Sequence, residues 1–493
     1  MDGELRKPDE LHARDREWDA LVDFVADPSP GATLGLVYGR RRQGKTLMLE
    51  LLAEATGGFM FTAREQPERQ NLQELSAAYA RHAGLPASLA FDNWPDVIDA
   101  LLGLGHAASE AVPVIIDEFP NLVAQASALP SMIQIALSPR SHATRNLRSR
   151  LILCGSALTG MRDLLGGGAP LRGRAKLELV LQPFWYREAA SFWQLTDDPE
   201  LAFRVHALLG GTPAYRAMAY GPPADRQSFD HWVAQRLLNP ASALFREGSL
   251  LLREESGLTD PAPYHGVLGA IAAGAARRSE IAGRIGRPAT AIAHLLAGLQ
   301  QIGLIARLDD AFRERRGIYR LTDPLIRLHE LVIAPNERLL VRERGTQVWT
   351  VNADTVAAKI YGPHLEDLAR EWCLNHASSA ALGGLAHDVN PATIACRKHQ
   401  QGHEIDVVVV ETSAGERRRV VAIGEVKSTV RPIDVAAIAR LDHLRDLLPG
   451  SQIAAPPRLL LYSRAGFTAD ARRTASGRHD VELIDLDRLY RGD

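Results

Sequence analysis

The chain has few cysteines, no long apolar run and no excess of charge of one sign. Its three cysteines, Cys154, Cys373 and Cys396, are far apart and lack the paired spacing of a zinc site or a disulfide framework, so neither is expected. No apolar stretch reaches membrane-spanning length, and the charged N-terminus does not resemble a signal peptide. We therefore expect a protein of the reducing cytoplasm with no membrane partner.

The charge balance argues against a global attraction to nucleic acid or to membranes. The 57 basic and 59 acidic side chains nearly cancel, which leaves a formal net charge of −2, so any basic surface must be local. A chain of 493 residues with 46% hydrophobic content is long enough for several independent cores. Several domains are therefore expected.

The first third of the chain alternates apolar strand-like segments with helical patterns. This alternation predicts a parallel sheet with helices on both faces. The expected strands are 34–38, 58–62, 112–117, 151–154 and 176–181. From residue 186 to about 255 the strand patterns give way to helical periodicity, interrupted by a Gly-Gly-Thr-Pro break at 210–213. We interpret this second region as a helical lid.

A glycine-rich motif directly follows the first expected strand and precedes a helical pattern. The motif consists of Gly39, Arg40, Arg41, Arg42, Gln43, Gly44, Lys45 and Thr46. This is the arrangement of a P-loop, in which backbone N–H groups and the helix N-terminus bind the β-phosphate of a nucleotide. Lys45 is expected to reach the β- and γ-phosphates of ATP, and the hydroxyl of Thr46 to bind Mg²⁺.

Acidic and hydroxyl side chains end two of the other expected strands. Asp117 is expected to hold the Mg²⁺ shell, and Glu118 to orient and deprotonate the attacking water. Ser156, after the strand at 151–154, is a candidate sensor of the γ-phosphate, with Thr159 as a substitute. A helix cap after a core strand is the competing interpretation of Ser156.

The region 256–340 contains helices followed by a polar, arginine-bearing hairpin. A short capped helix at 279–286, a helix opening at Pro288 and the hairpin that follows look like a winged helix-turn-helix. The residues expected to face DNA are Arg287, Thr290 and His294, and those expected to contact phosphates are Arg313, Arg315 and Arg316. Winged helices also serve as protein-docking modules, and both interpretations remain open.

The C-terminal region 350–493 carries a second candidate site. If the two strands on either side of the turn 413–416 form a symmetric hairpin, the residue numbers of paired positions sum to 831, which sets Asp406 opposite Glu425. Two opposed carboxylates are destabilising unless a cation intervenes, so the pair predicts a Mg²⁺ or Mn²⁺ site, with Lys427 on the face of Glu425. Alternatively, Lys427 pairs with Glu404 across the hairpin.

These C-terminal residues resemble the PD-(D/E)xK nuclease motif. In such nucleases the carboxylates bind Mg²⁺ and the lysine steadies the attacking water or the phosphate. By this resemblance Glu366, on the first helix of the region, matches an additional acid of the nuclease site. The fold is also found without activity.

Most of the chain resembles the archaeal-type AAA ATPases, which lie near the signal-transduction ATPases with numerous domains. The resemblance is carried by GRRRQGKT, VIIDEF, CGSALTGM, LRGRAKLELVLQPF and GGTPAY, in that order. It implies a sheet of order 5-1-4-3-2. It also implies that Arg174 stabilises transition-state charge, in cis or from a neighbouring subunit, and that Pro213 lies near the adenine. A helix break with no ligand contact is the alternative for Pro213.

The expected fold is therefore multi-domain α/β. We expect a P-loop NTPase domain at 1–185, a helical lid at 186–255, a winged helix at 256–340 and a restriction-endonuclease-like α/β domain at 350–493. The predicted function is ATP binding and hydrolysis coupled to DNA binding and to metal-dependent DNA cleavage. A non-cleaving ATP-dependent switch, or an adaptor with a homo-oligomeric or protein partner and a degenerate nuclease domain, is the alternative.

Overall fold

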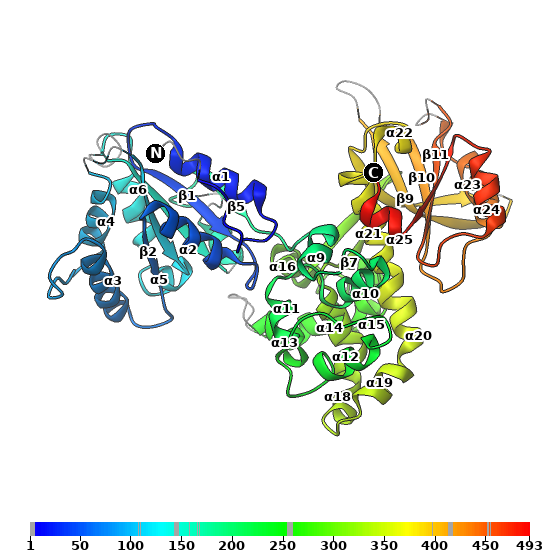
Figure 1. Cartoon of the computed structure of the whole chain (residues 1–493), viewed down its shortest axis with the longest axis horizontal. Helices are drawn as coiled ribbons and strands as arrows, with labels where there is room; N and C mark the ends of the chain where they lie inside the picture. Colours follow the sequence, from blue (N-terminus) through cyan, green and yellow to red (C-terminus); the bar gives the residue numbers. More distant parts are fainter. Residues whose placement is uncertain are drawn as a thin grey trace. The chain divides into compact units, whose positions relative to one another are not determined.

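The computed structural model divides the chain into two compact units, each described here by itself (Figure 1). The structure describes residues 5–106, 108, 110–141, 147–156, 158–164, 166, 168–253, 260–396, 398–412, 418–450, 453 and 455–493. Unit 1 comprises the chain up to residue 183 together with 212–214. Unit 2 comprises 184–211, 215–253 and the chain from 260 onward.

Unit 1 is built on a five-stranded parallel sheet. Its strands are β1 (Thr33–Tyr38), β2 (Phe59–Thr62), β3 (Val112–Asp117), β4 (Ser149–Gly155) and β5 (Ala175–Val180). They are ordered β2-β3-β4-β1-β5, with every pair parallel, so the predicted order 5-1-4-3-2 is confirmed. All five strands lie within two residues of their predicted bounds.

Helices cover both faces of this sheet, as the alternating pattern predicted. The helices of unit 1 are α1 (Asp15–Ala26), α2 (Lys45–Thr56), α3 (Glu68–His82), α4 (Trp94–Gly103), α5 (Phe119–Gln125), α6 (Leu129–Ala136) and α8 (Leu158–Asp163). On one face α1 and α2 pack against a core that includes Val37, Ile115 and Ile152. On the other face α3 to α6 cover Leu36 and Leu153. Successive residues of each strand thus enter different cores, which explains why the strands read as continuous apolar runs.

Unit 2 begins with helices and a two-stranded hairpin. The elements are α9 (Tyr186–Phe192), α10 (Pro199–Leu209), α11 (Ala214–Met218), α12 (Phe229–Arg236), α13 (Ala243–Arg253), α14 (Ala262–Ala272), α15 (Arg278–Arg284), α16 (Ala293–Gln301), β6 (Ile305–Asp310) and β7 (Arg313–Leu321). The helix expected to open at Pro288 begins five residues later. Its predicted apolar face, Ile292, Leu295, Leu296 and Leu299, is buried.

A run of helices then leads into the second sheet. These are α17 (Pro324–Leu328), the π-helix η1 (His329–Ile333), α18 (Ala334–Leu340), α19 (Gly345–Val351), α20 (Ala353–Val356), the π-helix η2 (Ala357–Tyr361), α21 (Gly362–Asn375) and α22 (Ser379–Leu382). No helix in the part of the chain that the structure describes combines the length and apolarity needed to cross a bilayer.

The second sheet mixes antiparallel and parallel pairs. Its elements are β8 (Asp388–Cys396), β9 (Gln401–Glu411), β10 (Arg419–Lys427), α23 (Val435–Asp446), β11 (Arg458–Ser463), α24 (Ala469–Ser476), β12 (Val481–Asp485) and α25 (Leu486–Arg491), with strand order β12-β11-β10-β9-β8. In the β9–β10 hairpin the partners of residues 422–424 are 409–407, so the residue numbers sum to the predicted 831. A bulge between Val420 and Ala422 changes the sum to 830 toward the turn. The predicted turn at 413–416 lies outside the described residues.

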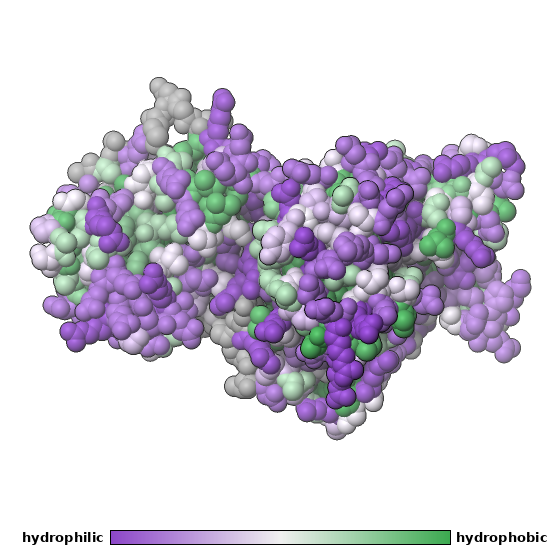
Figure 2. Space-filling model, turned by 60° about the horizontal axis from the view of Figure 1, so that its bottom comes forward, coloured by the Kyte–Doolittle hydropathy of each residue, from purple (hydrophilic) through white to green (hydrophobic). Residues whose placement is uncertain are grey.

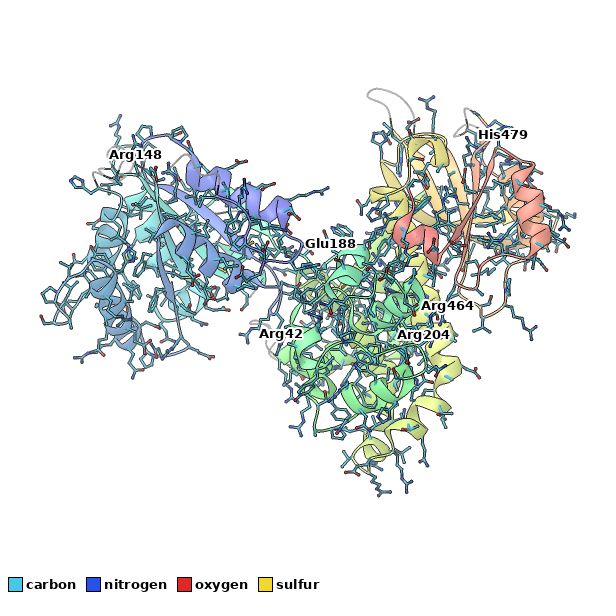
Figure 3. All side chains as sticks on the ribbon, in the orientation of Figure 1. Arg42, Arg148, Glu188, Arg204, Arg464 and His479 are labelled. Carbon is cyan, nitrogen blue, oxygen red and sulfur yellow. The ribbon has the colours of Figure 1, made fainter. Side chains whose placement is uncertain are left out.

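The helices at 186–253 pack with the C-terminal region. Tyr186 donates its hydroxyl to the carbonyl of Leu489 at 2.6 Å. Arg464 pairs with Glu200 at 2.5 Å, and its guanidinium lies 4.5 Å from the ring centroid of Tyr361; Figure 3 labels Arg464 beside Arg204, which also binds Glu200. These helices therefore belong to unit 2. Residues 212–214, which interrupt this region, belong to unit 1.

The surface carries small apolar patches among polar side chains. The face in Figure 2 is hydrophilic over most of its area, with separate green patches. Among the described residues, the most exposed large apolar side chains are Val351, Val430, Tyr220 and Ile135. Ile135 and Val351 lie on different helices, and Tyr220 and Val430 lie in separate connections, so the four are scattered, as single apolar surface residues normally are.

Candidate functional site

The loop after β1 has the backbone geometry of a phosphate-binding loop. Gly39 has φ +154°, and a Cβ there would lie 2.5 Å from the carbonyl oxygen of Leu181, so only glycine fits against β5. Arg42 and Gly44 also have positive φ, and Gly44 is the N-cap of α2. Because this N-cap has no side chain, the first N–H groups of α2 are open to an anion.

The two polar side chains that begin α2 are held in place. Lys45 is buried, and its Nζ donates to the carbonyl oxygens of Gly39 and Arg40 at 2.8 Å each. Burial lowers the pKa of Lys45. Thr46 donates its hydroxyl to Oδ2 of Asp117 at 2.8 Å, and Asp117 is 1% exposed. A hydroxyl and a carboxylate from two elements thus converge, and both are the hard oxygen ligands that Mg²⁺ prefers.

The second acid lies beside the hydroxyl that ends β4. Glu118 has φ 51°, an uncommon conformation for a residue that is not glycine, and it caps α5. Ser156 donates its hydroxyl to Oε2 of Glu118 at 2.9 Å. The sequence predicted both residues at the carboxyl ends of neighbouring strands, and the structure brings them into contact. The side chain of Thr159 lies outside the described residues.

These residues surround one cavity of about 420 Å³ in unit 1. Its lining consists of Arg41, Arg42, Gly44, Lys45, Thr46, Glu118, Ser156, Pro213 and Ala214. Pro213 therefore lies at the same cavity as the P-loop, although it is far away in sequence. Gln43 points away from the lining: it is 1% exposed and donates from Nε2 to Oγ1 of Thr212 at 3.2 Å.

Arg14 contacts the P-loop, although no sequence motif marks it. It is 6% exposed, has φ 120°, and donates to the carbonyl oxygens of Gln43 at 3.2 Å and Gln182 at 2.8 Å. It thereby ties the loop to the segment after β5. The charged N-terminal sequence gave no sign that one of its arginines would be buried.

Arg174 lies at the opposite edge of the sheet from the P-loop. It precedes β5, whose first residue, Ala175, pairs with Leu34 near the start of β1. The P-loop follows the other end of β1, where Tyr38 pairs with Val180. At about 3.3 Å per residue the edges are roughly 15 Å apart. The structure thus does not bring Arg174 to the P-loop cavity, and its role in cis or from a neighbouring subunit stays a prediction.

A second polar site lies in unit 2 at the end of the β9–β10 hairpin. Continuing the observed register by one residue sets Asp406 opposite Glu425. Asp406 accepts from the N–H of Val426 at 2.8 Å, and burial, with neighbouring Glu425, raises its pKa. Glu425 is buried and pairs with Lys427 at 2.5 Å and Arg440 of α23 at 2.9 Å. Lys427 thus pairs with Glu425 rather than with Glu404, the alternative that the sequence left open.

Glu366 reaches this site from α21. Burial raises its pKa to about 7; Arg370, at 3.7 Å, opposes that shift, while neighbouring Asp406 adds to it. Glu366 and Asp406 both line a cavity of about 690 Å³ whose walls also come from α14, β7 and β8. Burial, together with the mutual repulsion of the acids, thus raises the pKa of both carboxyl groups at this cavity, and a bound cation would stabilise their charged forms.

The residues expected to contact DNA differ in their surroundings. Arg287, Thr290 and His294 are all exposed, as is Arg313 at the start of β7. The side chains of Arg315 and Arg316 lie outside the described residues. The tip of the β6–β7 hairpin is docked on β8: the N–H of Ala311 donates to Pro391, and Asp310 accepts from the N–H of Thr393, both at 3.0 Å. The hairpin tip is thus occupied by the second sheet.

The sheet order, the glycine-rich loop and the acids beside it define unit 1 as a P-loop NTPase fold. Among solved structures, the chain is similar to a Walker-type ATPase of Pyrococcus abyssi, with 20% identity, a TM-score of 0.50, and coverage of 66% of this chain and 99% of the other. The ORC2 protein of Aeropyrum pernix is more distant, with 17% identity, a TM-score of 0.38 and coverage of 69% and 97%. No protein-family model matches the chain, and no curated protein matches it.

Proposed function

We propose that the chain binds and hydrolyses ATP at the cavity of unit 1. The observation that carries this proposal is the convergence of Lys45, the Thr46–Asp117 pair and the Ser156–Glu118 pair on one side of the sheet. Thr46 and Asp117 would hold Mg²⁺, which neutralises charge on the β- and γ-phosphates. Glu118 would accept the proton of the attacking water, and Lys45 would bind the phosphates. Pro213 would lie next to the adenine of the nucleotide.

The test is ATP binding and hydrolysis by the purified full chain. Lys45→Ala should abolish both, whereas Glu118→Gln should keep binding within a few-fold and lower hydrolysis by roughly 10²- to 10⁴-fold, the usual contribution of a general base. The matched control is Lys176→Ala, which removes a half-exposed lysine of β5. Hydrolysis that survives in Lys45→Ala would contradict the proposal.

We infer a second, metal-dependent activity at the hairpin of unit 2, namely cleavage of DNA. Asp406 and Glu425 would hold Mg²⁺ or Mn²⁺, and Glu366 would complete the acid set from α21. Burial and the nearby Glu425 raise the pKa of Asp406, and a cation between the two carboxylates would offset both effects, which supports this assignment. Lys427, already next to Glu425, would steady the attacking water or the phosphate. Arg440, which binds Glu425, is the feature most consistent with a degenerate, non-cleaving domain.

Cleavage of single- and double-stranded DNA with Mg²⁺ or Mn²⁺, with and without ATP, separates these alternatives. Asp406→Asn should abolish cleavage, and Lys45→Ala should alter it if ATP controls the nuclease. Asp388→Asn is the matched control, because Asp388 is a half-exposed acid on β8 paired with Arg418. No cleavage under any condition, with ATP hydrolysis intact, would reject the nuclease and leave a nucleotide-driven switch or an adaptor.

We propose that DNA is contacted by the exposed residues around α16, namely Arg287, Thr290 and His294, with Arg313 at the adjoining hairpin. Because the hairpin tip is docked on β8, the turn before α16 should contribute more than the hairpin. Arg287→Ala should weaken DNA binding and lower its dependence on salt, as expected for one lost phosphate contact. Equal affinity in wild type and Arg287→Ala over a salt series would contradict this surface.

The three cysteines form no disulfide bond, which fits a location in the reducing cytoplasm.

A further inference from the structure

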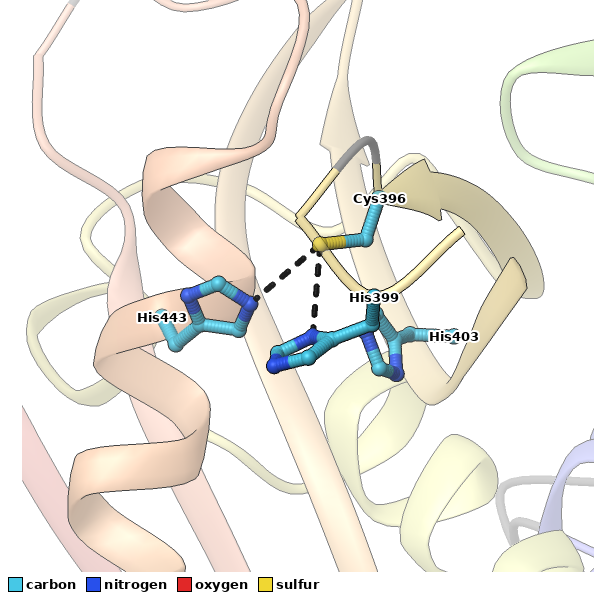
Figure 4. A group of neighbouring side chains, drawn as sticks. All are labelled: Cys396, His399, His403 and His443. Carbon is cyan, nitrogen blue, oxygen red and sulfur yellow. Dashed lines mark hydrogen bonds between the residues drawn. The ribbon is translucent and has the colours of Figure 1, made fainter. Parts of the chain in front are cut away.

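Four side chains that bind transition metals converge at one end of the second sheet. Cys396 ends β8, His399 follows in the connection, His403 lies on β9, and His443 lies in the last turn of α23 (Figure 4). Each offers one ligand atom, and these four atoms all lie within 4.8 Å of one another. Three of the four residues fall within eight positions of the sequence, whereas His443 is brought in by the fold.

Three distances between the ligand atoms are close to the edges of a tetrahedron around zinc. Bonds of about 2.3 Å to sulfur and about 2.05 Å to nitrogen give edges of about 3.6 Å for S–N and about 3.4 Å for N–N. Sγ of Cys396 lies 3.4 Å from Nδ1 of His399 and 3.7 Å from Nε2 of His443. Nδ1 of His399 lies 3.1 Å from Nε2 of His403.

The orientation of the three imidazole rings also fits a shared metal ion. The three imidazoles meet at interplanar angles of 87°, 72° and 84°, with centroids 5.2 to 5.9 Å apart, so they converge without stacking. The described residues hold one other cluster of metal-binding type, His265, His329 and Glu330. There both histidines contact the same carboxylate oxygen, at 2.8 and 3.3 Å, and hydrogen bonds are a sufficient explanation.

We propose that Cys396, His399, His403 and His443 bind one Zn²⁺ ion. One thiolate and three imidazoles are ligands of a borderline-soft ion, unlike the oxygen sets that Mg²⁺ and Ca²⁺ require. Four protein ligands fill a tetrahedral shell and leave no position for water, so the site is structural. The metal fastens the β8–β9 connection to α23.

This connection lies close to the acid site of unit 2. Arg440, which binds Glu425 at 2.9 Å, precedes His443 by less than one turn of α23. By fixing the C-terminal end of α23, zinc would hold Arg440 over Glu425. The zinc site does not depend on whether Asp406 and Glu425 cleave DNA.

The test is the metal content of the full chain, purified without a histidine tag and dialysed against metal-free buffer. We expect about one zinc per chain by mass spectrometry, falling at least five-fold in Cys396→Ser and His443→Gln. His479→Gln, which changes an exposed histidine outside the cluster, should keep the metal, and so should His265→Gln in the other cluster. Zinc that persists in both ligand variants, or that disappears only in His265→Gln, would overturn the assignment.

A second measurement covers variants that fail to fold. Wild type stripped with a chelator should take up one equivalent of Co²⁺ and show the intense visible bands of tetrahedral cobalt together with a thiolate charge-transfer band. One equivalent of Zn²⁺ should then displace the cobalt. Failure of stripped, folded wild type to bind either ion, or octahedral cobalt without a thiolate band, would overturn the proposal.

Discussion

At the scale of single residues, the proposed hydrolysis in unit 1 is expected to depend on the hydrogen bond between Ser156 and Glu118. The hydroxyl donates to Oε2 at 2.9 Å, and the backbone of Glu118 is held in a left-handed conformation. The bond therefore sets the direction of a carboxylate whose backbone cannot relax easily. A residue expected to be a phosphate sensor or a helix cap would thus also position the proposed general base.

Replacing this serine separates positioning from binding. Ser156→Ala should leave the ATP dissociation constant within about three-fold and lower kcat about ten-fold, because Glu118 loses its orienting donor. Ser156→Thr keeps the hydroxyl and should recover most of the rate. Isothermal titration and steady-state hydrolysis measure the two quantities. A loss of binding equal to the loss of kcat would instead assign Ser156 to the phosphates.

Glu366 should make the stability of unit 2 depend on pH. Its folded pKa of about 7 lies above the ordinary 4.5, so the folded chain retains a proton that the unfolded chain releases first. The free energy of unfolding should therefore fall as pH rises from about 4.5 to 7. The side chain of Glu366→Gln cannot titrate. The melting temperature of this variant minus that of wild type should therefore be larger at pH 8 than at pH 5, with both proteins measured in the presence of a chelator. The control is Glu337→Gln, which replaces an exposed acid on α18. Its melting temperature relative to wild type should be the same at both pH values.

At the scale of elements, two glycines of the P-loop have different tasks. Gly39 packs against the carbonyl of Leu181, whereas a Cβ on Gly44 would meet no atom of the chain within 4 Å. Both have positive φ, so alanine strains the backbone at either position. Gly39→Ala should additionally force the loop away from β5, whereas Gly44→Ala intrudes on the open N-terminus of α2.

We therefore expect Gly39→Ala to lower the melting temperature of unit 1 by several degrees more than Gly44→Ala. Gly44→Ala should nonetheless lose ATP binding at least ten-fold, since a methyl group would stand where phosphate is expected. Thermal denaturation and nucleotide titration of both variants provide the comparison. Equal destabilisation of the two would show that the contact with Leu181 contributes little.

The elements that local patterns determine were predictable, and those that depend on distant packing were not. The strands of unit 1, the order of its sheet and the 831 register follow from hydrophobic runs, a family resemblance and hairpin symmetry. The start of α16 and the buried Arg14 depend on tertiary packing. Paired spacing between cysteines did not predict the cluster of Cys396, His399, His403 and His443, because the cluster contains one cysteine. The pattern Cys-x2-His-x3-His over 396–403 was the signal for it in the sequence.

At the scale of the whole molecule, the division into two units predicts two unfolding transitions with different ligands. Unit 1 holds the proposed nucleotide cavity, and unit 2 holds the proposed zinc site, each with its own hydrophobic core. A ligand that binds only the folded form raises its stability by about 2.7 kcal/mol at one hundred times its dissociation constant. In calorimetry, MgATP should therefore raise one transition by several degrees, and removal of zinc should lower the other.

Two variants assign the transitions. Lys45→Ala should cancel the shift caused by MgATP and leave the effect of the chelator intact, whereas His443→Gln should do the reverse. A chelator that binds zinc much more tightly than Mg²⁺ keeps the two treatments separate. If both ligands moved a single transition together, the units would unfold as one cooperative block, and a nucleotide bound at Lys45 would be thermodynamically linked to the acid site beside Arg440.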